Sequence, residues 1–132
     1  MNPFPANLEF ENAGVIRGRQ HIRLTREFTA ITSLGTIRVP AGTLSDGASI
    51  PQAAMSIVGD RFDYLREATV HDHLYSPNNR TFTRAQADLI LRELMWNVGI
   101  PAWKVSAFWL AVRIGGRRAY KARISKMETP TP

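Results

Sequence analysis

The sequence predicts an α+β fold, with a small N-terminal antiparallel β-hairpin or sheet followed by a bundle of about four helices. Two observations predict it. From residue 21 to residue 31, apolar and polar side chains alternate with the period of a strand, and after residue 50 apolar side chains recur at helical spacing. The chain has 132 residues, of which 44% are hydrophobic. That length favours a single domain over residues 1–132 with one core.

The first expected elements are strands. A short strand at 8–11 precedes residues 21–31, where apolar and polar side chains alternate. A turn at 33–35 leads into a second strand at 35–40, which Pro40 ends. We therefore expect a hairpin of these two longer strands, joined by one or two N-terminal strands.

Four helices are expected to follow. A proline at a first helical position begins the first and the fourth, and the pair Thr83 and Gln86 fits a capping box at the start of the third. The fourth is apolar on most of its faces, which predicts that it is the central helix. The expected ranges are 52–58, 63–75, 83–99 and 101–116.

Charge and composition exclude some classes of protein. There is no cysteine, so thiolate metal sites and cysteine nucleophiles are excluded. The longest apolar stretch, 100–114, is too short and too charged for a membrane span. The net charge is +6, and residues 117–132 form a basic C-terminal segment. The segment either forms a solvated helix face or makes a weak contact with nucleic acid. Its bases are Arg117, Arg118, Lys121, Arg123 and Lys126.

Asp88 is the most informative polar residue of the expected third helix. It shares a stripe with Leu91, Met95 and Val98, and that stripe faces the core. An unpaired carboxylate there is costly by several kcal/mol. Asp88 therefore needs a partner, and His71, an arginine or a metal ion would serve.

The expected second helix carries the stretch "HDHLY". His71 shares an apolar face with Ala68 and Tyr75, so we expect it to be at least partly buried. Asp72 follows it directly, and Tyr75 is within reach of both. His73 points away from that face, so we do not expect it to be a ligand.

The loop "SDGASIP" supplies two more candidates. Asp46 is able to cap a turn or to bind a cation, and Gly47 allows a positive φ. Ser49 is favoured as a helix cap over a nucleophile, because a serine nucleophile needs a general base within reach.

Three motifs in this order, "SDGASIP", "HDHLY" and "RAQAD", resemble a family of small bacteriophage and prophage proteins catalogued as domain of unknown function 1353. The resemblance covers roughly residues 8–116. It implies a strand-rich N-terminal part and a phage context, but no reaction. A second, local likeness is the H-D-x-x-Y core of secreted phospholipases A2, whose disulfides this chain lacks. There the histidine activates water and the aspartate holds calcium.

Two hypotheses follow for function. In the first, the protein has a hydrolase-like site acting on host envelope or a small molecule, with His71, Asp72 and Asp88 as catalytic residues and Ser49 and Tyr75 as supporting ones. A divalent ion (Ca²⁺, Mg²⁺, Mn²⁺ or Zn²⁺) would be held by Asp46, His71, Asp72 and Asp88. In the second, the same residues form a structural polar network in a virion, tail or assembly protein that binds other phage proteins. The resemblance implies the cytoplasm of an infected host as the location, with incorporation into the virion as an alternative.

Overall fold

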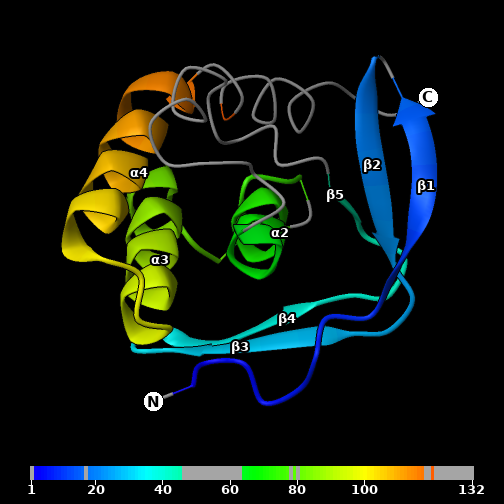
Figure 1. Ribbon diagram of the computed structural model, residues 1–132, viewed down its shortest axis with the longest axis horizontal. Helices are drawn as coiled ribbons and strands as arrows, with labels where there is room; N and C mark the ends of the chain where they lie inside the picture. The colour runs from blue at the N-terminus through cyan, green and yellow to red at the C-terminus, as the bar shows by residue number, and fades with distance from the viewer. Residues whose placement is uncertain are drawn as a thin grey trace.

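A computed structural model describes residues 2–16, 18–45, 64–77, 79, 81–117 and 120. Within them the fold is mixed α+β, with N-terminal antiparallel strands in two small sheets followed by three helices (Figure 1). The expected α+β class is confirmed. The described part of the bundle has three helices rather than about four, and the helix expected at 52–58 lies outside the described residues.

One sheet has the strand order β1-β2-β5, formed by β1 (Phe10–Ile16), β2 (Arg19–Leu24) and β5 (Leu44–Ser45). All its pairs are antiparallel. A β-bulge interrupts the β1–β2 register between Asn12 and Gly14, where Gly14 has a φ of 80°. A glycine tolerates that left-handed conformation without a steric penalty.

The second sheet is the hairpin of β3 (Phe28–Thr32) and β4 (Gly35–Val39). Its expected turn at 33–35 is confirmed, because Thr32 pairs with Gly35 across a two-residue loop. The prediction of a single strand at 21–31 is wrong, because β2 ends at Leu24 and the chain continues as β3 in the other sheet. The alternation survives the bend, since Ile22, Leu24 and Phe28 are all buried.

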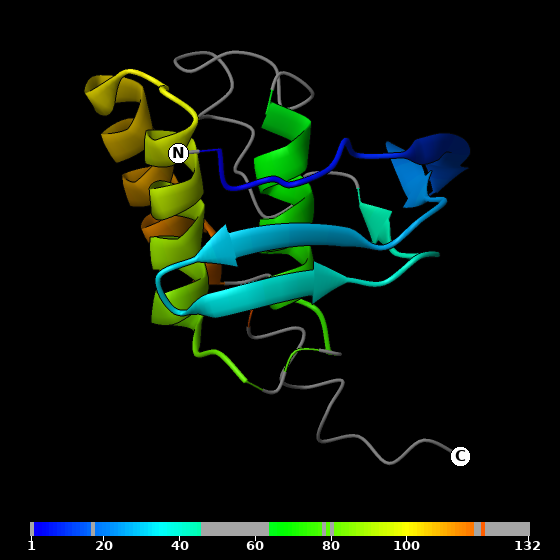
Figure 2. The same ribbon diagram turned by 90° about the horizontal axis from the view of Figure 1, so that it is seen from below.

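The helices are α2 (Leu65–Leu74), α3 (Arg84–Asn97) and α4 (Ala102–Gly115). The capping box of α3 is present as expected, with Thr83 and Gln86 bonding each other's backbone amides. In Figure 1, α3 lies between α2 and α4, and the β3–β4 hairpin runs below α2. In the turned view of Figure 2, the same hairpin lies in front of α2 and α3.

The prediction that the fourth helix is central is wrong. α3 contacts both other helices and β3, whereas α4 lies at the edge of the bundle (Figure 1). One face of α4 packs against α2 and α3 and the opposite face is exposed. The apolar character of α4 therefore reflects two separate faces rather than burial on all sides.

Two clusters of buried side chains form the core. The larger one fills the space between the strands, α2 and α3, and the smaller one joins α2, α3 and α4. The smaller cluster consists of Ala68, Leu91, Met95, Val105, Phe108 and Val112. Polar residues of α2 and α3 lie among these apolar side chains, and they are the candidates for function. Among the described residues, no helix combines the length and apolar character needed to cross a bilayer.

Candidate functional site

Asp88 is the centre of a buried polar cluster. Its side chain has no exposed surface, and neither has that of His71. The Oδ1 atom lies 2.7 Å from His71 Nε2 and accepts a hydrogen bond of 2.6 Å from the Tyr75 hydroxyl. The Oδ2 atom accepts a bond of 2.8 Å from Arg113 Nη1. The sequence predicts that Asp88 needs a partner, and in the structure both a histidine and an arginine take that role.

Helix geometry explains why these side chains meet. His71 and Tyr75 are four residues apart at the end of α2, so they lie on one face with their ring centroids 4.3 Å apart. That face packs against α3, where Asp88 lies one turn after the helix begins. Arg113 reaches the same carboxylate from the last turn of α4. All three described helices therefore contribute to the cluster.

Burial and hydrogen bonding act in opposite directions on Asp88. Burial raises the pKa of its carboxyl, but the hydrogen bonds from His71, Tyr75 and Arg113 hold that pKa below its usual range. The pKa of the Tyr75 hydroxyl shifts in the opposite direction. Burial, followed by its hydrogen bond to Asp88 and the negative charge there, raises the pKa of its hydroxyl. Asp88 is therefore a carboxylate and Tyr75 a neutral donor.

The charge state of Asp88 determines the tautomer of His71. A carboxylate only accepts hydrogen bonds, so His71 Nε2 must carry the proton that lies between them. In the neutral imidazole, Nδ1 is then the basic nitrogen. The pair has the arrangement of a general base held by a carboxylate, as in hydrolytic enzymes that orient histidine in this way.

The last turn of α4 is fixed against this cluster from two sides. The Arg84 guanidinium donates hydrogen bonds to the carbonyls of Val112, at 2.9 Å, and Arg113, at 2.5 Å. Gly116 lies so close to Tyr75 that an added Cβ would be 2.8 Å from the hydroxyl oxygen and 2.5 Å from the Val112 carbonyl. The absence of a side chain at this position lets Tyr75 reach Asp88.

Asp72 connects the cluster to the loop motif. Its Oδ2 atom accepts a hydrogen bond of 2.5 Å from the hydroxyl of Ser45, the last residue of β5. The half-buried Asp72 therefore lies where the "SDGASIP" stretch begins, one residue along α2 from His71. Asp46 and Ser49 lie outside the described residues, as does the rest of that loop.

The structure separates Asp88 from Asp72 as a possible metal ligand. Among the residues that the structure describes, no three acidic or imidazole side chains are grouped as a metal ion requires. Both oxygens of Asp88 accept bonds from protein donors, one of them a cation. That arrangement favours Asp88 as a residue that orients His71 over a metal ligand. Asp72 and Asp46 remain as candidate ligands.

Sequence reasoning missed three residues near the cluster. Arg113 was not among its candidate residues, yet the guanidinium pairs with Asp88. Arg84 was not among them either, yet its guanidinium donates hydrogen bonds to the last turn of α4. Glu67, one turn before His71 on α2, is 3% exposed, and burial raises its carboxyl pKa. The signal for Arg113 was a lone arginine in the apolar run of α4, near a core aspartate that lacked a cation.

The remaining candidates lie apart from the cluster. His73 is half-buried, and burial lowers its pKa. Of the bases in the C-terminal segment, Arg117 is exposed and the other four lie outside the described residues.

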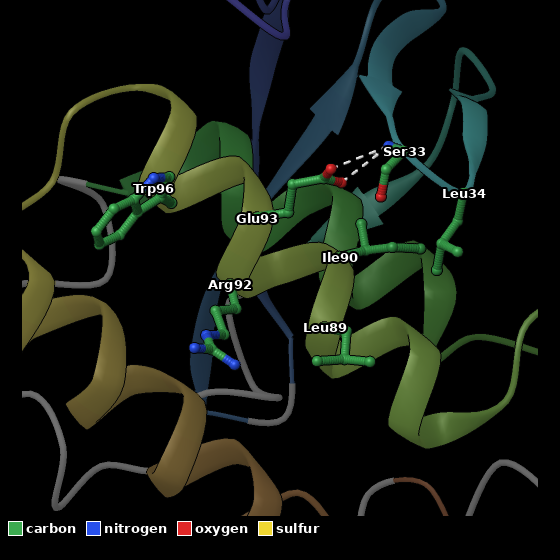
Figure 3. Close-up of a pocket in the computed structure, with 7 residues that line it drawn as sticks. All are labelled: Ser33, Leu34, Leu89, Ile90, Arg92, Glu93 and Trp96. Carbon is green, nitrogen blue, oxygen red and sulfur yellow. Dashed lines mark hydrogen bonds between the residues drawn. The ribbon is translucent and has the colours of Figure 1, made fainter.

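A surface pocket of about 450 Å³ lies between the β3–β4 turn and α3 (Figure 3). Among its lining residues, the single backbone N–H of Ser33 is shared between the two carboxylate oxygens of Glu93, at 3.0 and 3.1 Å. Residues of the Asp88 cluster do not line it; its lining is Ser33, Leu34, Leu89, Ile90, Arg92, Glu93 and Trp96.

Comparison with known proteins identifies the family. The family described as "Protein of unknown function (DUF1353)" matches residues 22–112, which include α2, α3 and all but the end of α4. The chain belongs to this family. The matched region contains His71, Asp72, Tyr75 and Asp88, whereas Arg113 lies one residue beyond its end.

A relative of the protein comes from a bacterium. The "Uncharacterized protein y4jT" of Sinorhizobium fredii (strain NBRC 101917 / NGR234) is 38% identical over 80 residues. The match covers 59% of this chain and 23% of the relative, so the chain corresponds to about a quarter of that protein. No solved structure matches the chain.

Proposed function

We propose that this DUF1353 protein is a phage or prophage protein with a hydrolase-like site, in which His71 is the general base and Asp88 orients it. The observation that carries the proposal is the 2.7 Å contact between His71 Nε2 and the buried Asp88 carboxyl, whose pKa is lowered by its hydrogen bonds. It supports a protonated Nε2 and a basic Nδ1, which is the state that removes a proton from water.

The other residues of the cluster have separate roles in this proposal. Tyr75 and Arg113 hold the Asp88 carboxylate in place, so the orientation of His71 does not depend on one bond. Asp72, and Asp46 beyond the described residues, would hold a divalent ion. That ion would lower the pKa of bound water, which is the usual contribution of a metal to hydrolysis. The substrate would be a component of the host envelope or a small molecule.

The test compares two histidines on one helix. The purified full chain is assayed against phospholipid vesicles, peptidoglycan fragments and activated esters, with a divalent ion and with chelator. We expect His71→Gln to lower the hydrolysis rate at least about a hundredfold, because general base catalysis typically contributes that much. His73→Gln is the matched control and should keep the wild-type rate. Equal rates in the two variants would remove His71 from the mechanism.

A structural role is the second candidate, because His71 and Asp88 have no exposed surface. A closed Asp-His-Tyr-Arg network specifies one packing of three helices without any chemistry. The protein would then be a virion, tail or assembly component that binds other phage proteins. Presence of the protein in purified particles, together with no hydrolysis by the wild type, would support this candidate over the enzyme.

The phage context and the location in an infected cell rest on the family resemblance. A gene neighbourhood of tail or lysis genes would support that context. Nucleic-acid binding by residues 117–132 ranks last, because the segment lies outside the motifs. Deleting it should abolish a salt-dependent interaction with DNA if that function is real.

A further inference from the structure

The outer face of α4 carries a stripe of large apolar side chains. Trp103, Leu110 and Ile114 are 58%, 54% and 72% exposed. Their spacings of seven and four residues place them on one face of the helix. Single exposed apolar residues are common on protein surfaces, but an aligned set is typical of a binding face.

The stripe is separate from the face of α4 that stabilises the fold. Val105, Phe108 and Val112 are buried against α2 and α3, and they lie on the opposite side of the helix. The outer stripe is therefore not needed to complete the described core. α4 also lies at the edge of the bundle formed by the described helices (Figure 1), and its stripe side chains are exposed.

The charge of the sequence that carries the stripe selects the kind of partner. From residue 94 to residue 127 the sequence contains seven bases and no acid. Lys104 Nζ lies 5.6 Å from the centroid of the Trp103 ring, and Arg117, just beyond α4, is exposed. A second copy of the chain would bring bases against bases. An anionic partner with an apolar interior would match both the charge and the stripe.

We infer that the outer face of α4 docks on the surface of an anionic lipid bilayer. The Trp103, Leu110 and Ile114 side chains enter the boundary between headgroups and acyl chains, while Lys104 and Arg117 contact lipid phosphates. Tryptophan favours that boundary, and basic residues add affinity for anionic headgroups. Nucleic acid fits less well, because Leu110 and Ile114 offer nothing to phosphates or base edges.

The first experiment measures binding of the full chain to vesicles. Phosphatidylcholine vesicles with and without phosphatidylglycerol are sedimented with the protein at low and high salt. We expect binding that requires phosphatidylglycerol and weakens as salt screens the charges. Binding to DNA without binding to these vesicles would overturn the inference, as would binding to neither.

Matched variants locate the face. Ile114→Gln and Leu110→Gln should each weaken vesicle binding about tenfold, because each loses the burial of one aliphatic side chain. Val15→Gln is the control, since Val15 is 69% exposed on β1, on the opposite side of the molecule from α4 (Figure 1). An equal loss in Val15→Gln, or none in the α4 variants, would contradict the assignment.

Tryptophan fluorescence of the wild-type protein supplies a second measurement, which does not require a polar substitution on α4. Vesicles should shift the tryptophan emission to shorter wavelength, and Trp103→Phe should abolish that shift. A shift that persists in Trp103→Phe would place the contact elsewhere. The exposed stripe residues do not contact Asp88, so loss of lipid binding and loss of hydrolysis are separable results.

Discussion

At the scale of single residues, Asp88 controls the chemistry of its neighbours. Its charge fixes the proton on His71 Nε2 and keeps the Tyr75 hydroxyl protonated. The cost of burying that charge is offset by one cation and two neutral or chargeable donors. Each of these partners is therefore expected to contribute to stability as well as to any reaction.

Changes at Asp88 and Arg113 should destabilise the protein unequally. We expect Asp88→Asn to lower the free energy of unfolding by about 3 kcal/mol, because three hydrogen bonds to a charged group are weakened. Arg113→Gln should lower it by about 2 kcal/mol, since a third of the Arg113 side chain is exposed and water shares its role. Urea unfolding measures both values.

Arg117→Gln is the matched control for Arg113→Gln. Arg117 is an exposed arginine four residues further along the chain, so its replacement should change stability by less than about 0.5 kcal/mol. A similar loss in both arginine variants would indicate a general charge effect and would contradict the specific pairing with Asp88.

The candidate site was partly predictable from the residues themselves. A carboxylate on the core stripe of a helix requires a partner, and this argument correctly led to Asp88 and His71. It could not choose between an arginine and a metal ion, because that choice depends on which helix packs beside α3. Arg113 was therefore missed, although its isolation in an apolar helix was visible.

At the scale of elements, helices were predicted better than strands. The capping box at Thr83 is a local signal and fixed the start of α3. β1 was expected only at 8–11, because its mostly exposed side chains do not alternate and a bulge interrupts it. The bend after Leu24 preserves the alternation, so periodicity could not reveal that two sheets were involved.

Gly116 provides a test of the packing at the end of α4. In most helical positions alanine is favoured over glycine by about 1 kcal/mol. Here the new Cβ meets the Tyr75 hydroxyl and the Val112 carbonyl, so we expect Gly116→Ala to destabilise the protein by about 1–3 kcal/mol. Thermal unfolding measures the change, and Ser106→Ala on the exposed side of α4 is the control. Stabilisation by Gly116→Ala would contradict the close approach of Tyr75.

At the scale of the whole molecule, two buried carboxyls give opposite dependences of stability on pH. The pKa of Asp88 is lowered in the folded state, so its contribution is present above about pH 4 and is lost as the pH falls through the folded pKa. The pKa of Glu67 is raised, mainly by burial, so the stability linked to its proton is lost as the pH rises through the folded pKa.

Unfolding experiments at several pH values separate the two groups. The stability difference between wild type and Asp88→Asn should shrink below about pH 4. Glu67→Gln should be more stable than wild type at neutral pH, because it removes the ionisation of a buried group. A difference for Asp88→Asn that stays constant into acid would indicate that its carboxyl is not ionised in the folded protein.

The three-helix origin of the Asp88 contacts has a consequence for cooperativity. If α4 detached alone, Arg113 would leave with it and the carboxylate would lose its cation. If α2 detached, both remaining donors would leave. Partial opening of the bundle thus breaks at least one hydrogen bond to the Asp88 carboxylate, whichever helix moves. We therefore expect the three described helices to open together, with their slowly exchanging amide protons sharing one protection free energy in hydrogen-exchange measurements.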